Sequence, residues 1–203
     1  MAERSGVRWL FILGLGLLLL AVVGALVYGR LAVEPNSTPV IELGGGSLTA
    51  RKVYGSAVEV ATQWQEDARL TAVSCNCPAV GQQRDGAFDW VFQFFSPSVR
   101  RLALVAVTGE EARMVRESGA PYEVPTFSTD DWRVDSDQAL RAWWGRGGGS
   151  MVERRPDTDL AMQLRVSDET GGSPAWTVVG LIAGTDTAFT VVVDATSGEL
   201  VEP

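Results

Sequence analysis

The sequence predicts an α+β protein with an N-terminal transmembrane helix followed by two units, each a helix with a three-stranded antiparallel sheet. Three observations favour this class. An uncharged apolar run near the N-terminus is long enough to cross a bilayer. After it, a helical pattern followed by strand-like segments occurs twice. Both copies also place a tryptophan seventeen residues before a valine, Trp90 before Val107 and Trp176 before Val193.

The chain divides into six segments by composition and pattern. We expect a cytoplasmic N-terminus (1–8), a transmembrane anchor (9–29), a flexible tether (30–47), a first α-β-β-β unit (48–109), a connector (110–134) and a second α-β-β-β unit (135–203).

The predicted anchor carries no charge along its twenty-one residues. At 1.5 Å per residue it measures about 31 Å, which matches a hydrocarbon core of about 30 Å. A cleaved signal peptide is the alternative, but its apolar region is usually about 7–15 residues long and ends at small residues. Since this run is longer and ends in Leu26, Val27 and Tyr28, an uncleaved anchor is favoured.

The orientation follows from the arginines beside the anchor. Arg4 and Arg8 precede it, whereas Arg30 after it is offset by Glu34. Because positive charge stays on the cytoplasmic side, we expect a single-pass protein of the cell membrane with a cytoplasmic N-terminus and an extracytoplasmic C-terminal part.

The first unit begins with a helix and continues with three strands. From residue 48 the apolar residues recur at steps of three and four, which predicts a helix of about 18 residues. Alternating or β-branched apolar residues then predict strands at 70–77, 87–95 and 101–107.

The second unit repeats this order. Residues 110–133 contain Gly119, Pro121 and Pro125, and we expect them to be irregular. Asp135 as N-cap and Gln138 three residues later form a capping box that starts a helix. We expect that helix to end at its glycine cluster, followed by strands at these positions: 160–166, 175–182 and 188–194.

Charge and residue content exclude several functions. The formal net charge is −8, and −10 from residue 31 onward, so a nucleic-acid partner is not expected. The chain has no histidine, which removes the commonest general base and transition-metal ligand. We therefore expect no catalytic residues, no metal and no cofactor.

Cys75 and Cys77 are the two cysteines of the chain and form a Cys-x-Cys motif. In an oxidising compartment the pair could form a strained, labile disulfide and act as a thiol oxidoreductase. The alternative is two small apolar side chains on one strand face, with or without a structural bridge, and this alternative is favoured.

Two further clusters contain residues that can form sites. The acids Asp130, Asp131, Asp135 and Asp137 could bind a hard cation, but they lack an EF-hand pattern and helix capping explains half of them. The tryptophans near the second helix could include an exposed partner contact, because one helix face cannot bury adjacent rings equally well, but packing between the two units is the favoured alternative. They are Trp132, Trp143 and Trp144.

The layout resembles the PepSY-type domains of exported bacterial proteins. In that family a helix with spaced alanines precedes a three-stranded sheet with a tryptophan on its middle strand and a Gly-Glu turn after the last strand. The matching stretches are residues 64–70, 85–94, 134–140, 174–182 and 191–201. The resemblance implies a tandem of non-catalytic extracytoplasmic modules that bind or restrain peptidases.

The function expected is a membrane-tethered binding or regulatory module, non-catalytic, that acts on a peptide or protein partner through a sheet edge or the cleft between the units. Its other contact is the lipid bilayer, through the N-terminal helix. The alternatives are the membrane-anchored thiol oxidoreductase that uses Cys75 and Cys77, and a structural spacer of the envelope.

Overall fold

A computed structural model describes residues 49–77 and 89–201. Every described residue belongs to one compact part of the chain, residues 38–203. The expected cytoplasmic N-terminus, anchor and tether lie outside the described residues. Within the described ranges, the helices are too short or too polar to cross a bilayer.

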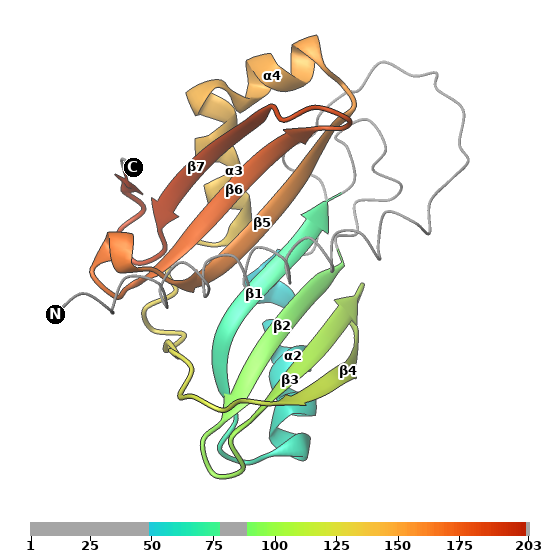
Figure 1. Cartoon of the computed structure of the whole chain (residues 1–203), viewed down its shortest axis with the longest axis vertical. Coiled ribbons are helices and arrows are strands. Elements are labelled where there is room, and N and C mark those ends of the chain that lie inside the picture. Colours follow the sequence, from blue (N-terminus) through green and yellow to red (C-terminus); the bar gives the residue numbers. More distant parts are fainter. Residues whose placement is uncertain (1–48, 78–88, 202–203) are drawn as a thin grey trace, which may run out of the picture. The chain divides into compact units, whose positions relative to one another are not determined.

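The described residues form helices and strands in an order that repeats along the chain (Figure 1). The helices are α2 (Ala50–Trp64), α3 (Ser136–Trp143), the π-helical turn η2 (Trp144–Gly148), α4 (Gly149–Arg154) and the 3-10 turn η3 (Asp168–Thr170). The strands are β1 (Arg69–Cys77), β2 (Trp90–Ser96), β3 (Arg101–Thr108), β4 (Glu111–Gly119), β5 (Thr158–Val166), β6 (Pro174–Ile182), β7 (Ala188–Asp194) and β8 (Leu200–Val201).

The strands form one antiparallel sheet in the order β4-β3-β2-β1-β5-β6-β7-β8. The prediction of an α+β fold is confirmed. The prediction of three strands in each unit is wrong in detail, because each unit contributes four strands. β1 pairs with β5, so the two units share one continuous sheet. Each unit is a meander that starts at the centre of the sheet and runs outward.

The connector expected to be irregular contains a strand. Residues 111–119 form β4, which pairs with β3 along its whole length from Thr108 opposite Glu111 to Arg101 opposite Gly119. Nearly all side chains of β4 are exposed, since it lies at the edge of the sheet. A strand that buries so few side chains has no apolar alternation, so its sequence carries no strand signal.

The second helix also continues further than expected. The capping box at Asp135 and Gln138 is confirmed, and α3 begins at Ser136. The glycine cluster does not end the helical segment: it passes through η2, bends at Gly147 with a φ of 133°, and continues as α4. Glycine adopts that positive φ without steric cost, so the chain kinks here rather than stopping.

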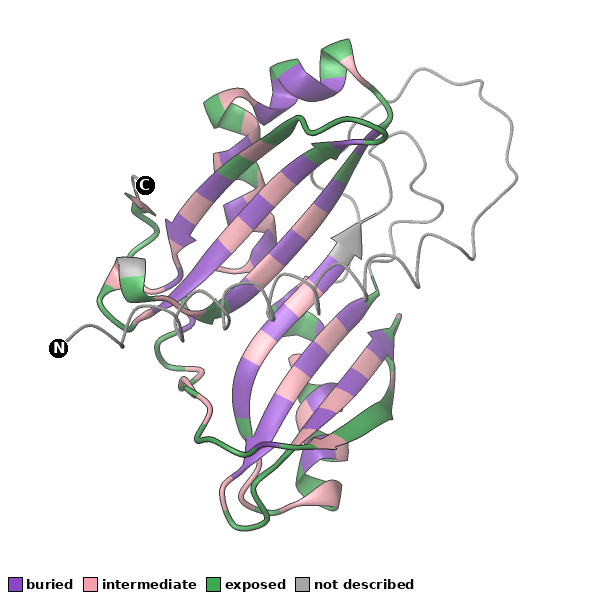
Figure 2. Cartoon of the chain, viewed as in Figure 1, coloured by how far each residue is buried: buried purple, intermediate pink, exposed green. Residues whose placement is uncertain are grey.

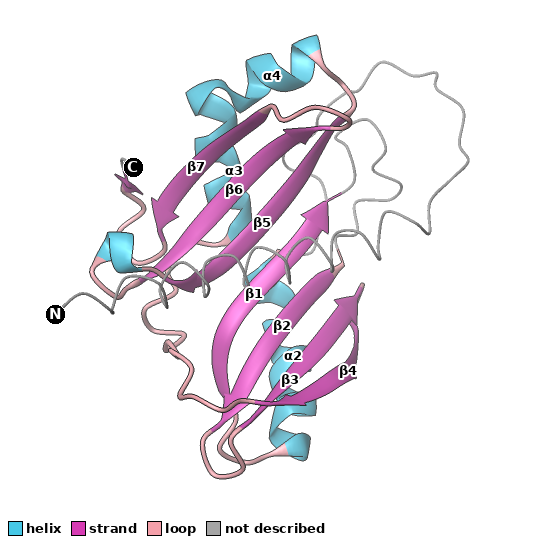
Figure 3. Ribbon diagram, in the orientation of Figure 1, coloured by secondary structure: helices cyan, strands magenta, loops and turns pink. Residues whose placement is uncertain are grey.

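The core lies between the sheet and its helices. Burial alternates along the strands (Figure 2), and the buried set includes the paired residues Trp90 and Val107 in one unit and Trp176 and Val193 in the other. The seventeen-residue spacing seen in the sequence is therefore a cross-strand pair, formed once in each unit. Helix α2 packs on β2, β3 and β4, and α3 packs on β6 and β7 (Figure 3).

The two units share backbone and aromatic contacts. The amide of Ala50 at the start of α2 donates to the Ser136 hydroxyl at 3.1 Å, and the next amide, that of Arg51, donates to the Asp135 carboxylate at 3.2 Å. The first turn of α3 thus caps the start of α2 as well as its own. Deeper in, the rings of Trp90 and Trp176 meet edge to face at 6.2 Å.

Asp67 ties the end of α2 to the turn between β2 and β3. Its carboxylate accepts hydrogen bonds from the Ser96 hydroxyl at 2.6 Å and from the Ser98 amide at 2.8 Å. The Ser96 bond, followed by the Ser98 bond, lowers the pKa of Asp67 below its ordinary value. The stabilisation it gives is present above the unfolded pKa of about 3.9 and is lost as the pH falls through the lower folded pKa.

We expect the Asp67→Asn variant to lose less stability than the wild-type chain when the pH is lowered from about 5 towards 2, because the titrating group is gone. Urea unfolding across this range measures the difference. Asp186→Asn, at an exposed residue of the β6–β7 loop, is the control and should follow the wild-type profile. Parallel profiles for wild type and Asp67→Asn would contradict the assignment.

Candidate functional site

A cleft opens where the central strands β1 and β5 diverge. Their pairing runs from Cys77 opposite Leu160 to Ala72 opposite Arg165, so the first three residues of β1 have no partner on β5. In place of β5, the connector approaches β1 there, and the Phe127 amide donates to the Leu70 carbonyl at 3.1 Å. The connector and the start of β1 thus become two walls of the cleft.

The cleft has a volume of about 540 Å³, and residues from four stretches of the chain line it. Tyr54 and residues 68–70 come from α2 and the start of β1, residues 126–129 with Asp131 come from the connector, and residues 172–174 come from the loop before β6. The first unit, the connector and the second unit therefore all contribute to the lining.

The connector wall is held in place by bonds to the second unit. The amides of Arg133 and Val134 both donate to the Ala195 carbonyl at 2.8 Å. The Thr196 hydroxyl donates to the Asp131 carbonyl at 2.6 Å. Since these bonds fix the backbone just after the cleft-lining residues, the wall has a defined position.

The loop wall is also ordered by local bonds. The Ser173 carbonyl accepts from the Thr170 hydroxyl at 2.6 Å and from the Ser167 amide at 3.1 Å. Gly171 and Gly172 adopt positive φ values of 67° and 94°, which let the chain turn tightly into β6. Ser173 is half-buried at the cleft as a result.

Tyr54 joins the cleft to the aromatic core. Its ring lies 5.8 Å from that of Trp132, 5.9 Å from that of Phe92 and 6.4 Å from that of Phe94. Burial raises the pKa of the Tyr54 hydroxyl above its ordinary value, so the group is a neutral donor at physiological pH. Within the described ranges, no hydrogen bond is found for this hydroxyl.

Two charged residues line the cleft, Arg69 and Asp131. Both are exposed, and neither forms an ion pair within the described part of the chain. The hydroxyls of Thr126, Thr129 and Ser173 likewise have no hydrogen-bond partner among the described residues. The cleft can therefore offer a cation, an anion and several hydroxyl groups to a ligand.

Cys75 is buried in the core at 2% exposure. It lies opposite Trp90 on β2 and Met162 on β5, and the backbone of Cys77 lies opposite Leu160. A reactive thiol has to reach both solvent and its substrate, so this position of Cys75 disfavours the oxidoreductase alternative. The side chain of Cys77, and so its bonding, lies outside the described groups.

Two of the three tryptophans considered as partner contacts are fully buried. Trp132 and Trp143 have 0% exposure and belong to the core, as the favoured alternative of packing between the units expects. The Trp143 indole donates to the Phe189 carbonyl at 2.9 Å. The Trp132 indole N–H has no partner in the described part. Trp144 is half-buried and packs edge to face on Trp143 at 6.3 Å.

The acids considered for a cation serve separate purposes. Asp135 caps α3 and α2, Asp137 pairs with Arg141 at 2.9 Å, and Asp131 lines the cleft. In the ranges that the structure describes, no group of three or more acidic or cysteine side chains could hold a metal ion.

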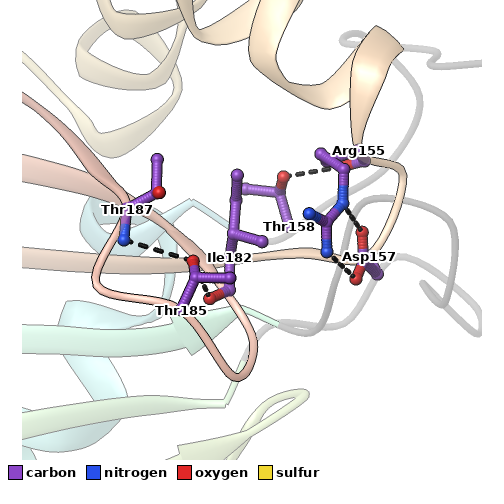
Figure 4. Close-up of polar contacts among 6 residues, drawn as sticks. All are labelled: Arg155, Asp157, Thr158, Ile182, Thr185 and Thr187. Atoms are coloured by element: carbon purple, nitrogen blue, oxygen red, sulfur yellow. Dashed lines mark hydrogen bonds and ion pairs between the residues drawn. The ribbon is translucent and has the colours of Figure 1, made fainter.

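A second set of polar contacts stabilises turns at the other end of β5 (Figure 4). Arg155 donates twice to Asp157, at 3.0 and 2.9 Å, and the Thr158 hydroxyl donates to the Arg155 carbonyl at 2.6 Å. In the β6–β7 loop the Thr185 hydroxyl donates to the Ile182 carbonyl at 3.0 Å. These groups bond to each other and leave little for a ligand.

Taken together, the fold and the cleft define an α+β module of two similar units with a polar cleft at their junction. No family model and no curated protein matches the chain. A solved structure with a related arrangement is that of a "putative lipoprotein" from Clostridium difficile 630, at 9% identity and a TM-score of 0.45, covering 79% of this chain and 95% of that chain. A likeness at this level carries no argument about function, and the resemblance to PepSY-type domains stays a prediction.

Proposed function

We propose that the chain is a non-catalytic binding module, tethered to the membrane by residues 9–29, that holds an extended peptide segment of a protein partner in the cleft between its two units. The observation that carries this proposal is the cleft of about 540 Å³ at the point where β1 and β5 diverge. Its size lies within the range of ligand sites, about 300–1,000 Å³.

The composition of the lining supports a peptide ligand. The half-buried Ala68 and Phe127 supply apolar surface beside the hydroxyls and the two charged groups. Peptides carry apolar side chains and a backbone with regular donors and acceptors, which this mixture complements. Fixed walls also reduce the entropy lost on binding.

The proposal is tested by photo-crosslinking in the cells that make the protein. A benzoylphenylalanine at Thr129, which lines the cleft, is expected to give a covalent adduct that maps to one short segment of a partner. The same group at Thr190, an exposed residue of β7 that does not line the cleft, is the control. No adduct at residue 129, or the same adducts from both positions, would contradict the proposal.

A further inference from the structure

We infer that the cleft recognises a single carboxylate on its peptide ligand, with Arg69 as the group that binds it. This inference rests on the proposed function and specifies the ligand. The carboxylate could belong to the C-terminus of the peptide or to an acidic side chain, and both present the same two oxygens.

Arg69 has a guanidinium that is available to a ligand. Arg101, Arg141 and Arg155 have carboxylate partners at 2.9 Å, and most other arginines of the described part have none, so what distinguishes Arg69 is its place at the cleft. Arg69 lines the cleft without such a partner in the described part of the chain. A planar guanidinium binds a carboxylate through two parallel N–H···O bonds, and so it favours that group among anions of a peptide.

Hydroxyl-bearing residues surround the same cleft. Tyr54, Thr126, Thr129 and Ser173 line it from three segments, and their hydroxyls have no partner within the described ranges. A carboxylate has about four lone-pair sites, two of which remain after a guanidinium has bound. Neutral hydroxyl donors can occupy the remaining sites without adding charge.

Negative charge in and around the cleft limits the charge of the ligand. Asp131 lines the same cleft, and the chain beyond residue 31 carries a net charge of −10. Both oppose a second negative charge near Arg69. A carboxylate with one charge therefore fits this cleft better than a phosphate, which carries nearly two at neutral pH.

Three short peptides test the inference on the full chain in detergent. The first is acetyl-Ala-Ala-Ala with a free C-terminus, the second is its C-terminal amide, and the third is the amide of acetyl-Ala-Asp-Ala. We expect the first or the third to bind, identified by calorimetry and by shifts of the Leu70 and Phe127 amide resonances, and the second to bind at least about tenfold more weakly. The first and third probes distinguish a terminal carboxylate from a side-chain carboxylate.

Variants separate the roles of the two charges. Arg69→Gln should weaken binding of the carboxylate probe about tenfold or more, whereas Asp131→Asn should strengthen it by about two- to fivefold. Arg154→Gln is the matched control and should leave binding unchanged. Arg154 is exposed at the end of α4, and the whole of β5, about 30 Å long, separates it along the chain from the loop that lines the cleft.

The inference fails if the amide probe binds as well as the carboxylate probes, if no carboxylate probe binds, or if Arg69→Gln binds like the wild-type chain. The proposed function is judged separately by crosslinking from residue 129. If that adduct forms and no carboxylate probe competes with it, the peptide site stands and its selectivity for a carboxylate is wrong. If the adduct is absent, the proposed function itself is wrong.

Discussion

Replacing Trp176 with alanine is expected to lower the free energy of unfolding by about 3–5 kcal/mol, the usual cost of removing a large buried ring. Trp176 has 0% exposure and contacts the rings of Trp90 at 6.2 Å and Trp132 at 6.1 Å. Its indole N–H also donates to the Val134 carbonyl at 2.8 Å. The substitution therefore removes contacts to the other unit and to the connector at once.

Urea unfolding measures this effect, and two controls interpret it. Trp176→Phe keeps an aromatic ring but loses the hydrogen bond to Val134, so its cost should be clearly smaller than that of alanine. Trp144→Ala removes a half-buried ring and should also cost less. A cost below about 1 kcal/mol for Trp176→Ala would mean that the ring is not part of a shared core.

The position of Trp176 further predicts how the two units unfold. Its contacts with Trp90, the pairing of β1 with β5 and the capping of α2 by Ser136 all cross the boundary between units. Units of about 60 residues have marginal cores of their own. One cooperative transition is therefore expected for the described region, and Trp176→Ala should shift that whole transition rather than split it.

Most strands could be predicted because their side chains alternate between a buried and a less buried position. The run from Trp90 to Phe94 alternates in this way, and so does the run from Ala103 to Val107. The capping box of α3 could also be predicted from the sequence, since Asp135 and Gln138 bond to backbone groups a few residues away. Both signals are local in sequence, so no tertiary knowledge was needed.

The failures have tertiary causes. β4 buries almost no side chain, so its pairing with β3 left no pattern in the sequence. The glycine cluster after α3 indicated a helix end, yet the structure uses Gly148 to bring the backbone against the Trp143 ring. The sequence around Gly148 does not show that the Trp143 ring occupies the position of a side chain there.

The cleft was foreseen only as a space between two units. Its lining combines Tyr54, Arg69, Thr126 and Ser173, which come from four places in the sequence and match no motif. They come together because β1 and β5 diverge at one end, and strand pairing of that kind depends on the whole sheet. A site built from loops at a junction has no sequence spacing to recognise.

The second unit is closely packed around Gly180. We expect Gly180→Ala to lower the free energy of unfolding by about 1–3 kcal/mol or more, which is the usual cost of overpacking. A methyl group there would lie 2.4 Å from Cζ2 of Trp143 and 3.2 Å from Sδ of Met151. The Trp143 ring cannot easily retreat, because Gly148 lies against its other atoms and its N–H is bonded to the Phe189 carbonyl.

Gly119→Ala provides the matched control, since Gly119 is also a strand residue but has open space where the methyl group would lie. At that site alanine should be neutral or stabilising by up to about 1 kcal/mol, because it reduces the entropy of the unfolded chain. Thermal and urea unfolding of the two variants give the comparison. If both variants had equal stability, the Trp143 ring would have room to move. That result would contradict the tight packing of β6 against α3 and α4.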